Sequence, residues 1–301
     1  LRKVDGGTFL TQVMTKIFEF LTLPCPPPNI IQGNALSDTA DALTDAAETM
    51  GVSSSKQPKT TKKVATQKVE TAAKTGILSL TGHGISEVPS AVWAIDKMTM
   101  LDLTQNSISQ LPAAIGGLRL LKTLKLDGNS LTGLPDMTGL AKLSTFSATD
   151  NKLDASALSQ LPGTLTKLLV SKNAVSSMDG IVRMTKLQVL ELSSNAIAVV
   201  PESVGELVAL VDLQLDDNQI EVVPAEIGAC KRLKILSLNR NRITGEVTDD
   251  FQPLPERLFT ETPLERLNLE GNAITRRQLN SFKGIDTWLE RRAATKPRTW
   301  E

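Results

Sequence analysis

The stretch Leu210-Val211-Asp212-Leu213-Gln214-Leu215-Asp216-Asp217-Asn218-Gln219-Ile220 sets leucine or isoleucine at four spaced positions around one asparagine. The stretch 233–243 repeats this arrangement. Nine positions carry the asparagine of the pattern, with histidine in the first: His83, Asn106, Asn129, Asn151, Asn173, Asn195, Asn218, Asn241 and Asn272. Successive positions are 22 or 23 residues apart, except for the last two, which are 31 residues apart. Such a period indicates a coil of stacked turns, each burying apolar side chains of its neighbours.

Most turns contain a Leu-x-Leu segment, for example Leu101-Asp102-Leu103, and the fourth turn has Phe146-Ser147-Ala148 in its place. Side chains alternate across a strand, so we expect the two leucines to point inward and Asp102 outward. Strands of successive turns are expected to pair in parallel about 4.8 Å apart, which makes nine turns roughly 40 Å long. The turn asparagine carries donors and an acceptor, so it can satisfy backbone groups that the turn would otherwise bury unpaired.

The signature Leu-x-x-Leu-x-Leu-x-x-Asn-x-Leu at this period resembles the leucine-rich repeat family. The resemblance implies an α/β solenoid: a leucine-rich repeat horseshoe of about nine turns with a parallel concave sheet, an irregular or short helical convex side, and helical caps. Prolines such as Pro112 and Pro224 fall on the returning side of the turns. A fixed φ and a missing N–H suit an irregular or short helical segment there.

Composition narrows the class of protein. The chain has 301 residues, of which 41% are hydrophobic, and 33 basic residues balance 33 acidic ones, so nothing in the net charge points to nucleic acid. No uninterrupted apolar run is long enough to span a bilayer.

Cys230 takes an inward position that leucine holds in other turns, so we expect a buried thiol. No cysteine cluster flanks the repeats, which favours a reducing, intracellular and cytoplasmic location.

Charge is distributed unevenly along the chain. Residues 1–50 carry a net charge of −3, residues 51–75 of +5 and residues 276–301 of +4. Residues 76–275, with 17 basic and 23 acidic side chains, carry −6. An acidic solenoid between two basic ends is expected to favour a basic protein partner.

Four regions are expected from these patterns. Residues 1–49 are a leader absent from the working protein, or a disordered or short helical extension. Residues 50–75 form a basic N-terminal segment and cap, residues 76–275 the repeat domain, and residues 276–301 a C-terminal helical cap with a basic tail. The caps are expected because the outer turns of a solenoid need cover.

Apolar residues at helical spacing mark both caps. The spacing predicts a short helix over residues 64–74, before the first turn. A second helix, expected to cover the last turn, is predicted by Leu279, Phe282, Ile285, Trp288 and Leu289.

The interval of 31 residues between Asn241 and Asn272 predicts a packed loop on the convex side or the rim. Its apolar residues are Phe251, Leu254, Leu258 and Phe259. Long loops often carry a binding function. Shielding of the end of the solenoid is the interpretation we prefer.

Residues 50–55, Met-Gly-Val-Ser-Ser-Ser, match the N-myristoylation pattern with Gly51 as the acceptor. One myristoyl chain binds a membrane only marginally, and a basic stretch adds up to ~1 kcal/mol per lysine near an anionic surface. The expected membrane-contacting residues are Lys56, Lys59, Lys62 and Lys63. The motif acts only at a free N-terminus, so if residues 1–49 are present, residues 50–63 are a solvated linker.

The flanks 69–76 and 284–291, with Ala294-Thr295-Lys296 after the second, are similar to those of the leucine-rich repeat-containing protein 57 family. The similarity runs from about Met50 to Lys296. It implies an intracellular, non-enzymatic protein with a lipidated glycine at Gly51. The 49 residues before Met50 and a longer lysine-rich spacer depart from that family, and the first departure puts the anchor in doubt.

No catalytic, cofactor or metal site is expected. The single histidine, His83, stands at a turn position, and neither cysteine has a histidine near it in the sequence. Asp216 and Asp217 lie beside Asn218 at the outward strand edge, where solvated or partner-facing carboxylates are expected rather than metal ligands.

The outward positions of the strands are free to vary and are the expected site for a protein partner. In the fifth to eighth turns, outward apolar residues lie beside acidic ones, as in protein interfaces. The predicted partner-binding residues of the concave face are Asp102, Lys125, Lys167, Leu169, Val189, Glu191, Asp212, Gln214, Asp216, Ile235 and Arg240. The alternative is a solvated sheet with tolerated apolar residues.

These observations predict a non-enzymatic interaction scaffold or adaptor, tethered to a membrane through Gly51. Two other functions stay open. One is a structural subunit of a large multiprotein assembly, in which residues 1–49 pack into neighbours. The other is a regulatory subunit that binds a phosphatase or a small GTPase.

Overall fold

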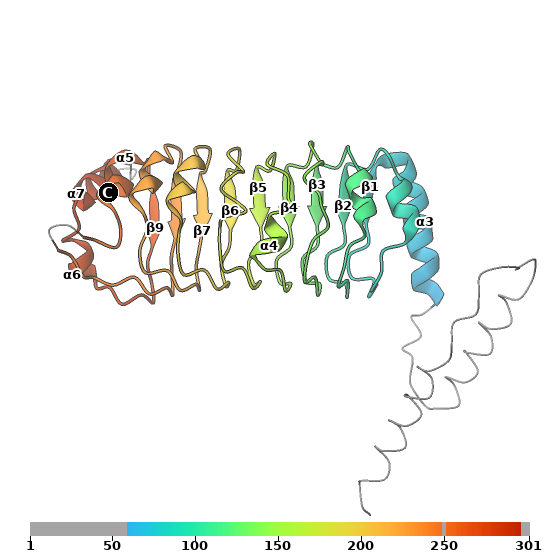
Figure 1. The fold of residues 1–301 in the computed structure, drawn as a ribbon, viewed down its shortest axis with the longest axis horizontal. Coiled ribbons are helices and arrows are strands. Elements are labelled where there is room, and N and C mark those ends of the chain that lie inside the picture. Colours follow the sequence, from blue (N-terminus) through green and yellow to red (C-terminus); the bar gives the residue numbers. More distant parts are fainter. Residues whose placement is uncertain (1–58, 249–250, 296–301) are drawn as a thin grey trace, which may run out of the picture. The chain divides into compact units, whose positions relative to one another are not determined.

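The computed structural model describes residues 59–248 and 251–295, and in this part of the chain nine short strands form one parallel sheet. The strands are β1 (Ile77–Ser79), β2 (Met100–Asp102), β3 (Thr123–Lys125), β4 (Thr145–Ser147), β5 (Lys167–Leu169), β6 (Val189–Glu191), β7 (Asp212–Gln214), β8 (Ile235–Ser237) and β9 (Arg266–Asn268). They follow one another in chain order, and Figure 1 shows the turns stacked side by side along one axis. The predicted solenoid of nine turns is confirmed.

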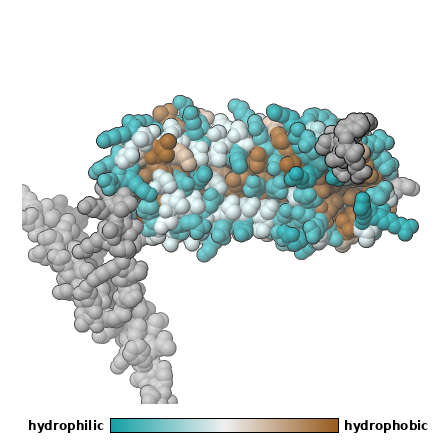
Figure 2. Space-filling model, turned by 180° about the vertical axis from the view of Figure 1, so that it is seen from behind, coloured by the Kyte–Doolittle hydropathy of each residue, from teal (hydrophilic) through white to brown (hydrophobic). Residues whose placement is uncertain are grey.

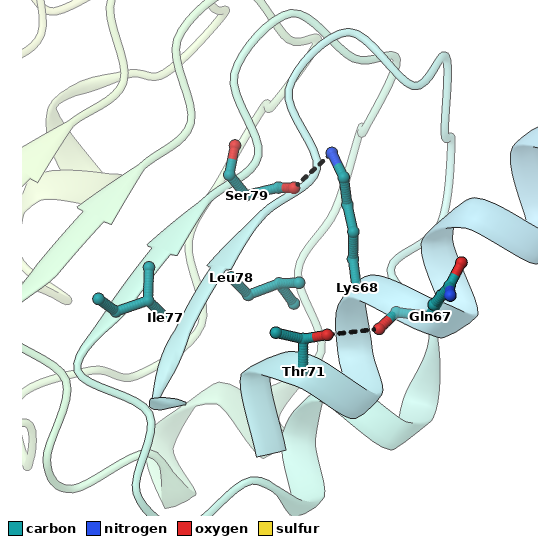
Figure 3. A pocket seen from close by; sticks show the side chains of 6 residues that line it. All are labelled: Gln67, Lys68, Thr71, Ile77, Leu78 and Ser79. Atoms are coloured by element: carbon teal, nitrogen blue, oxygen red, sulfur yellow. Dashed lines mark hydrogen bonds between the residues drawn. The ribbon is translucent and has the colours of Figure 1, made fainter. Parts of the chain in front are cut away.

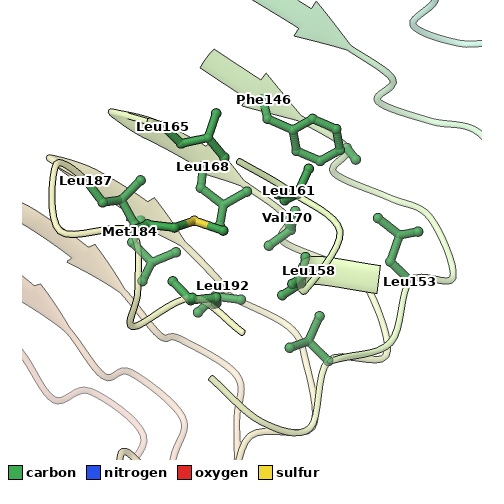
Figure 4. Packing of buried hydrophobic residues seen from close by; sticks show 14 of the residues in the cluster. Phe146, Leu153, Leu158, Leu161, Leu165, Leu168, Val170, Met184, Leu187 and Leu192 are labelled. Atoms are coloured by element: carbon green, nitrogen blue, oxygen red, sulfur yellow. The ribbon is translucent and has the colours of Figure 1, made fainter. Parts of the chain in front are cut away.

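The register places equivalent residues side by side. Leu101 aligns with Leu124, and Leu190 with Leu213. Each of these side chains is at most 1% exposed, so one row of inward leucines runs through the stack. The fourth turn keeps the row with Phe146 in place of leucine, packed among the leucines that Figure 4 shows around β5.

The turn asparagines join neighbouring turns. Asn106 Oδ1 accepts the N–H of Ile85 from the preceding turn at 3.1 Å. Its Nδ2 donates to the carbonyl oxygens of Leu80, in the preceding turn, at 2.8 Å and of Leu103, in its own turn, at 2.7 Å. Each later asparagine bridges to the turn before it in the same way. The amide therefore satisfies the buried backbone groups of two turns, as predicted.

One backbone feature was not predicted: in all nine turns, the residue before the turn asparagine, or before His83 in the first turn, has a positive φ. Six of these residues have side chains, namely Gln105, Asp150, Lys172, Ser194, Asp217 and Arg240. The other three are Gly82, Gly128 and Gly271. The left-handed conformation is thus a requirement of the turn itself, and glycine meets it without steric cost.

The convex side is made of short helices that begin after prolines. Four are 3-10 helices: η1 (Ser90–Ala94), η2 (Ala113–Gly117), η3 (Glu202–Glu206) and η4 (Ala225–Ala229). Each follows a proline, as Pro112 precedes η2 and Pro224 precedes η4. The fourth turn has α4 (Ala155–Leu158) instead, capped by the side chain of Asp154, and the third and fifth turns, both within the described residues, have no helix on this side.

The long interval between Asn241 and Asn272 contains α5 (Glu256–Glu261), which packs against η4 and extends the convex layer. Leu254, Leu258 and Phe259 are fully buried, as expected of a packed segment. The expectation was wrong for Phe251, which is 44% exposed because it lies before the segment that turns into the core.

Helices cover both ends of the array. At the N-terminal end α3 (Lys59–Thr75) begins before the predicted residue 64 and packs against β1. At the C-terminal end the chain forms α6 (Arg276–Leu279) and α7 (Ile285–Thr295). Ile285 and Trp288 of α7 are buried, and Trp288 Nε1 donates to the Leu264 carbonyl oxygen at 2.9 Å. Leu289 was predicted to join them but is 40% exposed, because it lies about 100° around the helix from Trp288.

Some predictions fall outside the described residues. They are the leader or extension 1–49, the acceptor Gly51, Lys56 and the basic tail from residue 296. Lys59, Lys62 and Lys63 lie within α3. The proposed domain boundaries therefore stay predictions.

Candidate interaction surface

The structure brings together most of the predicted partner-binding residues on strands β5 to β8. One row of outward residues in register is Lys167, Val189, Asp212 and Ile235. A second row is Leu169, Glu191, Gln214 and Ser237. All are half-buried except Ser237, which is buried. At about 4.8 Å between strands, this surface, which we call the β5–β8 face, is about 15 Å wide.

Glu191 lies at the centre of the β5–β8 face. Burial raises the pKa of its carboxyl group, and the carboxylates of Asp212 and Asp127 raise it further, while the positive charge of Lys167 opposes them. Partial burial removes interactions of the carboxylate with water, and the nearby Lys167 does not fully replace them. A cationic group of a partner would restore the lost interaction.

Asp212 is held in place by its own strand. Gln214 Nε2 donates to Asp212 Oδ1 at 2.6 Å, and both side chains project from the same face of β7. The contact fixes the carboxylate beside Ile235, its neighbour in the register. The result is an oriented acidic group next to an apolar one.

Asp216 was predicted to contact a partner, but its carboxylate already has structural partners. Its Oδ1 accepts the N–H of Asn239 at 2.7 Å and its Oδ2 accepts from Asn239 Nδ2 at 3.3 Å. The Oγ of Ser237 accepts from Asn239 Nδ2 at 3.3 Å and from Asn268 Nδ2 at 3.0 Å. These hydrogen bonds already engage the side chains of Asp216 and Ser237, so the surface available to a partner ends after Gln214 on β7.

Asp216 and Asn239 belong to a row of equivalent positions that was not predicted. It is the position after the second leucine, and its side chains in chain order are Thr81, Thr104, Asp127, Thr149, Ser171, Ser193, Asp216, Asn239 and Glu270. Every member carries a side-chain oxygen, and that regularity was the available signal. At Asp127 the same bonding recurs, since its Oδ1 accepts the N–H of Thr149 at 2.8 Å.

Arg240 lies beyond the end of β8, at a turn rather than on the sheet. Its Nε and Nη2 donate to Oδ1 and Oδ2 of Asp217, one turn earlier, at 2.5 and 2.6 Å. The pair is exposed at the rim. Arg240 is therefore a rim residue, outside the β5–β8 face.

Asp102 and Lys125 lie on β2 and β3, separated from the β5–β8 face by β4. Asp102 Oδ1 accepts the N–H of Thr104 at 3.0 Å and the hydroxyl of Thr81 at 3.2 Å. These contacts orient the carboxylate within the sheet. Three of the predicted residues, Asp102, Lys125 and Arg240, thus lie outside the cluster on β5–β8, and Asp216 is engaged by Asn239.

Known proteins share this architecture. A family model described as Leucine Rich Repeat matches residues 232–254. The functional domain of InlJ from Listeria monocytogenes is 22% identical with a TM-score of 0.51, over 73% of this chain and 48% of that one. The ectodomain of the receptor kinase GASSHO1/SCHENGEN3 from Arabidopsis thaliana is 29% identical with a TM-score of 0.54, over 65% of this chain and 25% of that one. The chain is a leucine-rich repeat solenoid.

A shorter solenoid is similar over most of its length. Internalin C2 of Listeria monocytogenes is 21% identical with a TM-score of 0.54, over 63% of this chain and 89% of that one. By contrast, the repeat solenoid described here covers less than half of the InlJ and receptor chains. No curated protein matches the chain, and the finer resemblance to leucine-rich repeat-containing protein 57 is not confirmed.

The one cysteine among the described residues is not placed to react. Cys230 is buried, its Sγ donates to the Val204 carbonyl oxygen at 3.4 Å, and burial raises the pKa of the thiol to about 11. Within residues 59–248 and 251–295, no group of three or more histidine, cysteine or acidic side chains is placed to hold a metal ion. In the same part of the chain no helix has the length and apolar character needed to cross a bilayer.

Proposed function

We propose that the chain is a non-enzymatic scaffold or adaptor whose β5–β8 face binds a segment of another protein. The observation that carries the proposal is the half-buried Glu191, aligned in the register with Leu169. An apolar side chain beside an under-compensated carboxylate suits a partner segment that pairs an apolar residue with a lysine or arginine.

The magnitudes fit a specific but modest contact. Leu169, Val189 and Ile235 are already half-buried, so covering them completely would contribute about 1 kcal/mol each. A cationic group at Glu191 would add specificity and orientation rather than a large gain in affinity. The ectodomain of the Arabidopsis receptor was solved in complex with CASPARIAN STRIP INTEGRITY FACTOR 2, which supports partner binding by such solenoids.

Charge reversal of Glu191 tests the proposal. Proteins cross-linked to the wild-type chain in cells are compared with those of Glu191→Lys and of Glu202→Lys, an exposed residue of η3 on the convex side. We expect Glu191→Lys to lose at least one partner that Glu202→Lys keeps. An identical set of partners for all three chains would reject this face.

The identity of the lost partner distinguishes the adaptor from its alternatives. A phosphatase or small GTPase would make the chain a regulatory subunit. Loss of a whole set of stably associated proteins would make it a structural subunit of an assembly. Either result keeps the β5–β8 face as the binding surface.

We also propose that Gly51 carries a myristoyl group in an intracellular protein, with the chain held at a membrane by that group and by basic residues. The motif at Met50-Gly51 and the similarity of residues 69–76 and 284–291 to the leucine-rich repeat-containing protein 57 family support it. Only seven residues lie between Gly51 and Lys59, the start of α3, and a chain of this length reaches at most about 28 Å. The lipid would therefore hold the N-terminal end of the solenoid close to the membrane.

The anchor is tested by the mass of the native N-terminus and by metabolic labelling with an alkyne-bearing myristate. We expect the mass of a myristoylated chain starting at Gly51, and label that Gly51→Ala abolishes. Replacing Lys56, Lys59, Lys62 and Lys63 together by Gln should keep the label but reduce membrane association. An unmodified start upstream of Met50 would rule the anchor out.

A further inference from the structure

The two edges of the sheet differ in how they are protected. At the N-terminal edge, Lys68 Nζ of α3 donates to the Ser79 carbonyl oxygen at 3.2 Å, and the Ile77 N–H donates to Thr75 Oγ1 at 3.3 Å. These side chains line or border a shallow groove of ≈ 440 Å³ between α3 and β1 (Figure 3). A lysine over an edge strand prevents the addition of another strand.

At the C-terminal edge, β9, no comparable hydrogen bond from a described residue covers the backbone donors. In the preceding turn the N–H of Leu238 donates to the Asn268 carbonyl oxygen at 2.9 Å, and that of Arg240 to the Glu270 carbonyl oxygen at 2.7 Å. The corresponding amides of the last turn belong to Leu269 and Gly271. They have no acceptor among residues 59–248 and 251–295.

The apolar side chains of the last turn are also incompletely covered. Leu267, Leu269 and Ile274 are half-buried, whereas the equivalent residues of the turn before, Leu236, Leu238 and Ile243, are at most 1% exposed. The cap helix α7 packs on α5, on the convex side, and leaves the strand side of the turn accessible. In the rear view of Figure 2, hydrophobic surface gathers toward the right, which is the C-terminal end of the stack.

Positive charge borders this end. Arg266 of β9 and Arg276 and Arg277 of α6 are exposed, and none of the salt bridges among the described residues involves them. The acidic residues nearby are partly compensated, since Glu265 pairs with Lys234 at 2.8 Å. The edge therefore favours an acidic occupant.

We propose that an extended segment of another protein adds to β9 as a tenth parallel strand. Its carbonyl oxygens would accept the N–H groups of Leu269 and Gly271, and the Glu265 carbonyl oxygen would accept from its amides, as in each inner pair of turns. The segment would carry an acidic residue beside Arg266, followed by the pattern apolar-x-apolar over Leu267 and Leu269.

A second copy of the chain is a poorer occupant. It would bring a second set of the same three arginines to the interface, with like-charge repulsion. In a copy related by a two-fold axis, the β9 strand would also run antiparallel to the first β9, whereas all other neighbouring strands of the sheet pair in parallel.

The chain itself supplies a probe. The peptide Val-Asp-Leu-Gln-Leu-Asp-Asp, the sequence of residues 211–217, has the required pattern, and its first aspartate, Asp212, is equivalent in the register to Arg266. We expect the fluorescently labelled peptide to bind the full chain saturably. A control peptide with serine in place of both leucines should bind at least tenfold more weakly.

Binding should depend on the edge and not on other basic surface. Arg266→Glu is expected to weaken peptide binding about tenfold, while Arg119→Glu, at an exposed arginine just before β3 and six strands away from β9, should change it less than twofold. Leu269→Pro removes one N–H donor at an edge, where proline is tolerated, and should abolish binding. Because Arg266 is exposed, its variant is expected to fold normally.

Hydrogen exchange locates the peptide. Exchange of the segment 264–272 should slow when the peptide binds, with the segment around Leu238 unchanged. Equal binding by Arg266→Glu and Leu269→Pro, or protection of β5–β8 instead, would overturn the proposal. Protection of 264–272 that rises with protein concentration alone would do so as well, by showing that a second copy occupies the edge.

Discussion

Arg240 donates two hydrogen bonds to Asp217, its equivalent one turn earlier, and both residues have a left-handed backbone, with φ of 51° and 54°. The ion pair holds the pKa of the Asp217 carboxyl group below its ordinary value. Such exposed pairs contribute little to stability. The shared backbone conformation matters more, because it recurs in the stack and directs the following asparagine inward.

Lys172 allows the conformational requirement to be measured by itself. It has a φ of 54°, and its side chain is exposed. A β-branched side chain is strained in this region, so Lys172→Val should lower the free energy of unfolding by about 1–2 kcal/mol relative to Lys172→Gly. Chemical denaturation of the two variants measures the difference. Equal stabilities would show that the turn can relax to a negative φ.

The repeat period and the signature were sufficient to predict the strands, their register and the inward leucines. Inward positions such as Leu101 are fixed by a two-residue alternation that is visible in the sequence. The left-handed position was missed because five different side chains, as well as glycine, occupy it, so no residue type marks it. Its requirement is a backbone property of the turn rather than a property of the side chain.

The candidate site was predicted less completely for a different reason. The outward placement of Glu191 and Leu169 follows from strand alternation and was correct. The hydrogen bonds between Asp216 and Asn239 join two turns, 23 residues apart in the sequence. Only a comparison of the oxygen-bearing residues at equivalent positions of all turns would have indicated them. Arg240 was predicted on the face, but it lies in the turn after β8, where the alternation of side chains along a strand no longer applies.

Asn218 is expected to be costly to replace. It is 8% exposed, its Oδ1 accepts the N–H of Ile197 at 3.0 Å, and its Nδ2 donates to the carbonyl oxygens of Leu192 and Leu215, each at 3.0 Å. Asn218→Ala leaves these groups unpaired in the interior and should lower the free energy of unfolding by about 3 kcal/mol or more. Denaturant titration followed by circular dichroism measures it.

A second variant of Asn218 distinguishes the accepting oxygen of the amide from its donating NH2 group. Asn218→Asp keeps the acceptor for Ile197 but loses both donated bonds and buries a charge. It should therefore be no more stable than Asn218→Ala. Stability close to that of wild type for either variant would contradict the bridging role of the asparagine.

Glu191 should make stability depend on pH. Its pKa is raised in the folded chain, mainly by burial, so the folded state binds more protons than the unfolded state between the ordinary and the raised value. The contribution of Glu191 to the free energy of unfolding is fully present below the ordinary pKa, and it is lost as the pH rises through the raised pKa of the folded state. Glu191→Gln removes the effect, so it should be more stable than wild type at pH 7 and show no gain below about pH 4.

Thermal unfolding at the two pH values tests this, with Glu202→Gln on the convex side as the control. The control should show no comparable gain at pH 7. A gain for Glu191→Gln that persists unchanged at low pH would mean that the side chain acts through packing rather than through its charge.

Trp288 and Leu289 are neighbours in α7 with opposite surroundings, which makes them a matched pair for testing the C-terminal cap. Trp288 is 3% exposed, its ring centroid lies 6.2 Å from that of Phe259, and the Arg292 guanidinium lies 4.8 Å from the ring centroid of Trp288. Trp288→Ala should cost about 3–5 kcal/mol, and Leu289→Ala only about 0.5 kcal/mol. Because each turn of a solenoid contacts its neighbours, the loss should appear as faster hydrogen exchange in the turns nearest α5 and spare those around β2. Uniformly faster exchange along the whole array would show that the cap stabilises the solenoid as a single cooperative unit instead.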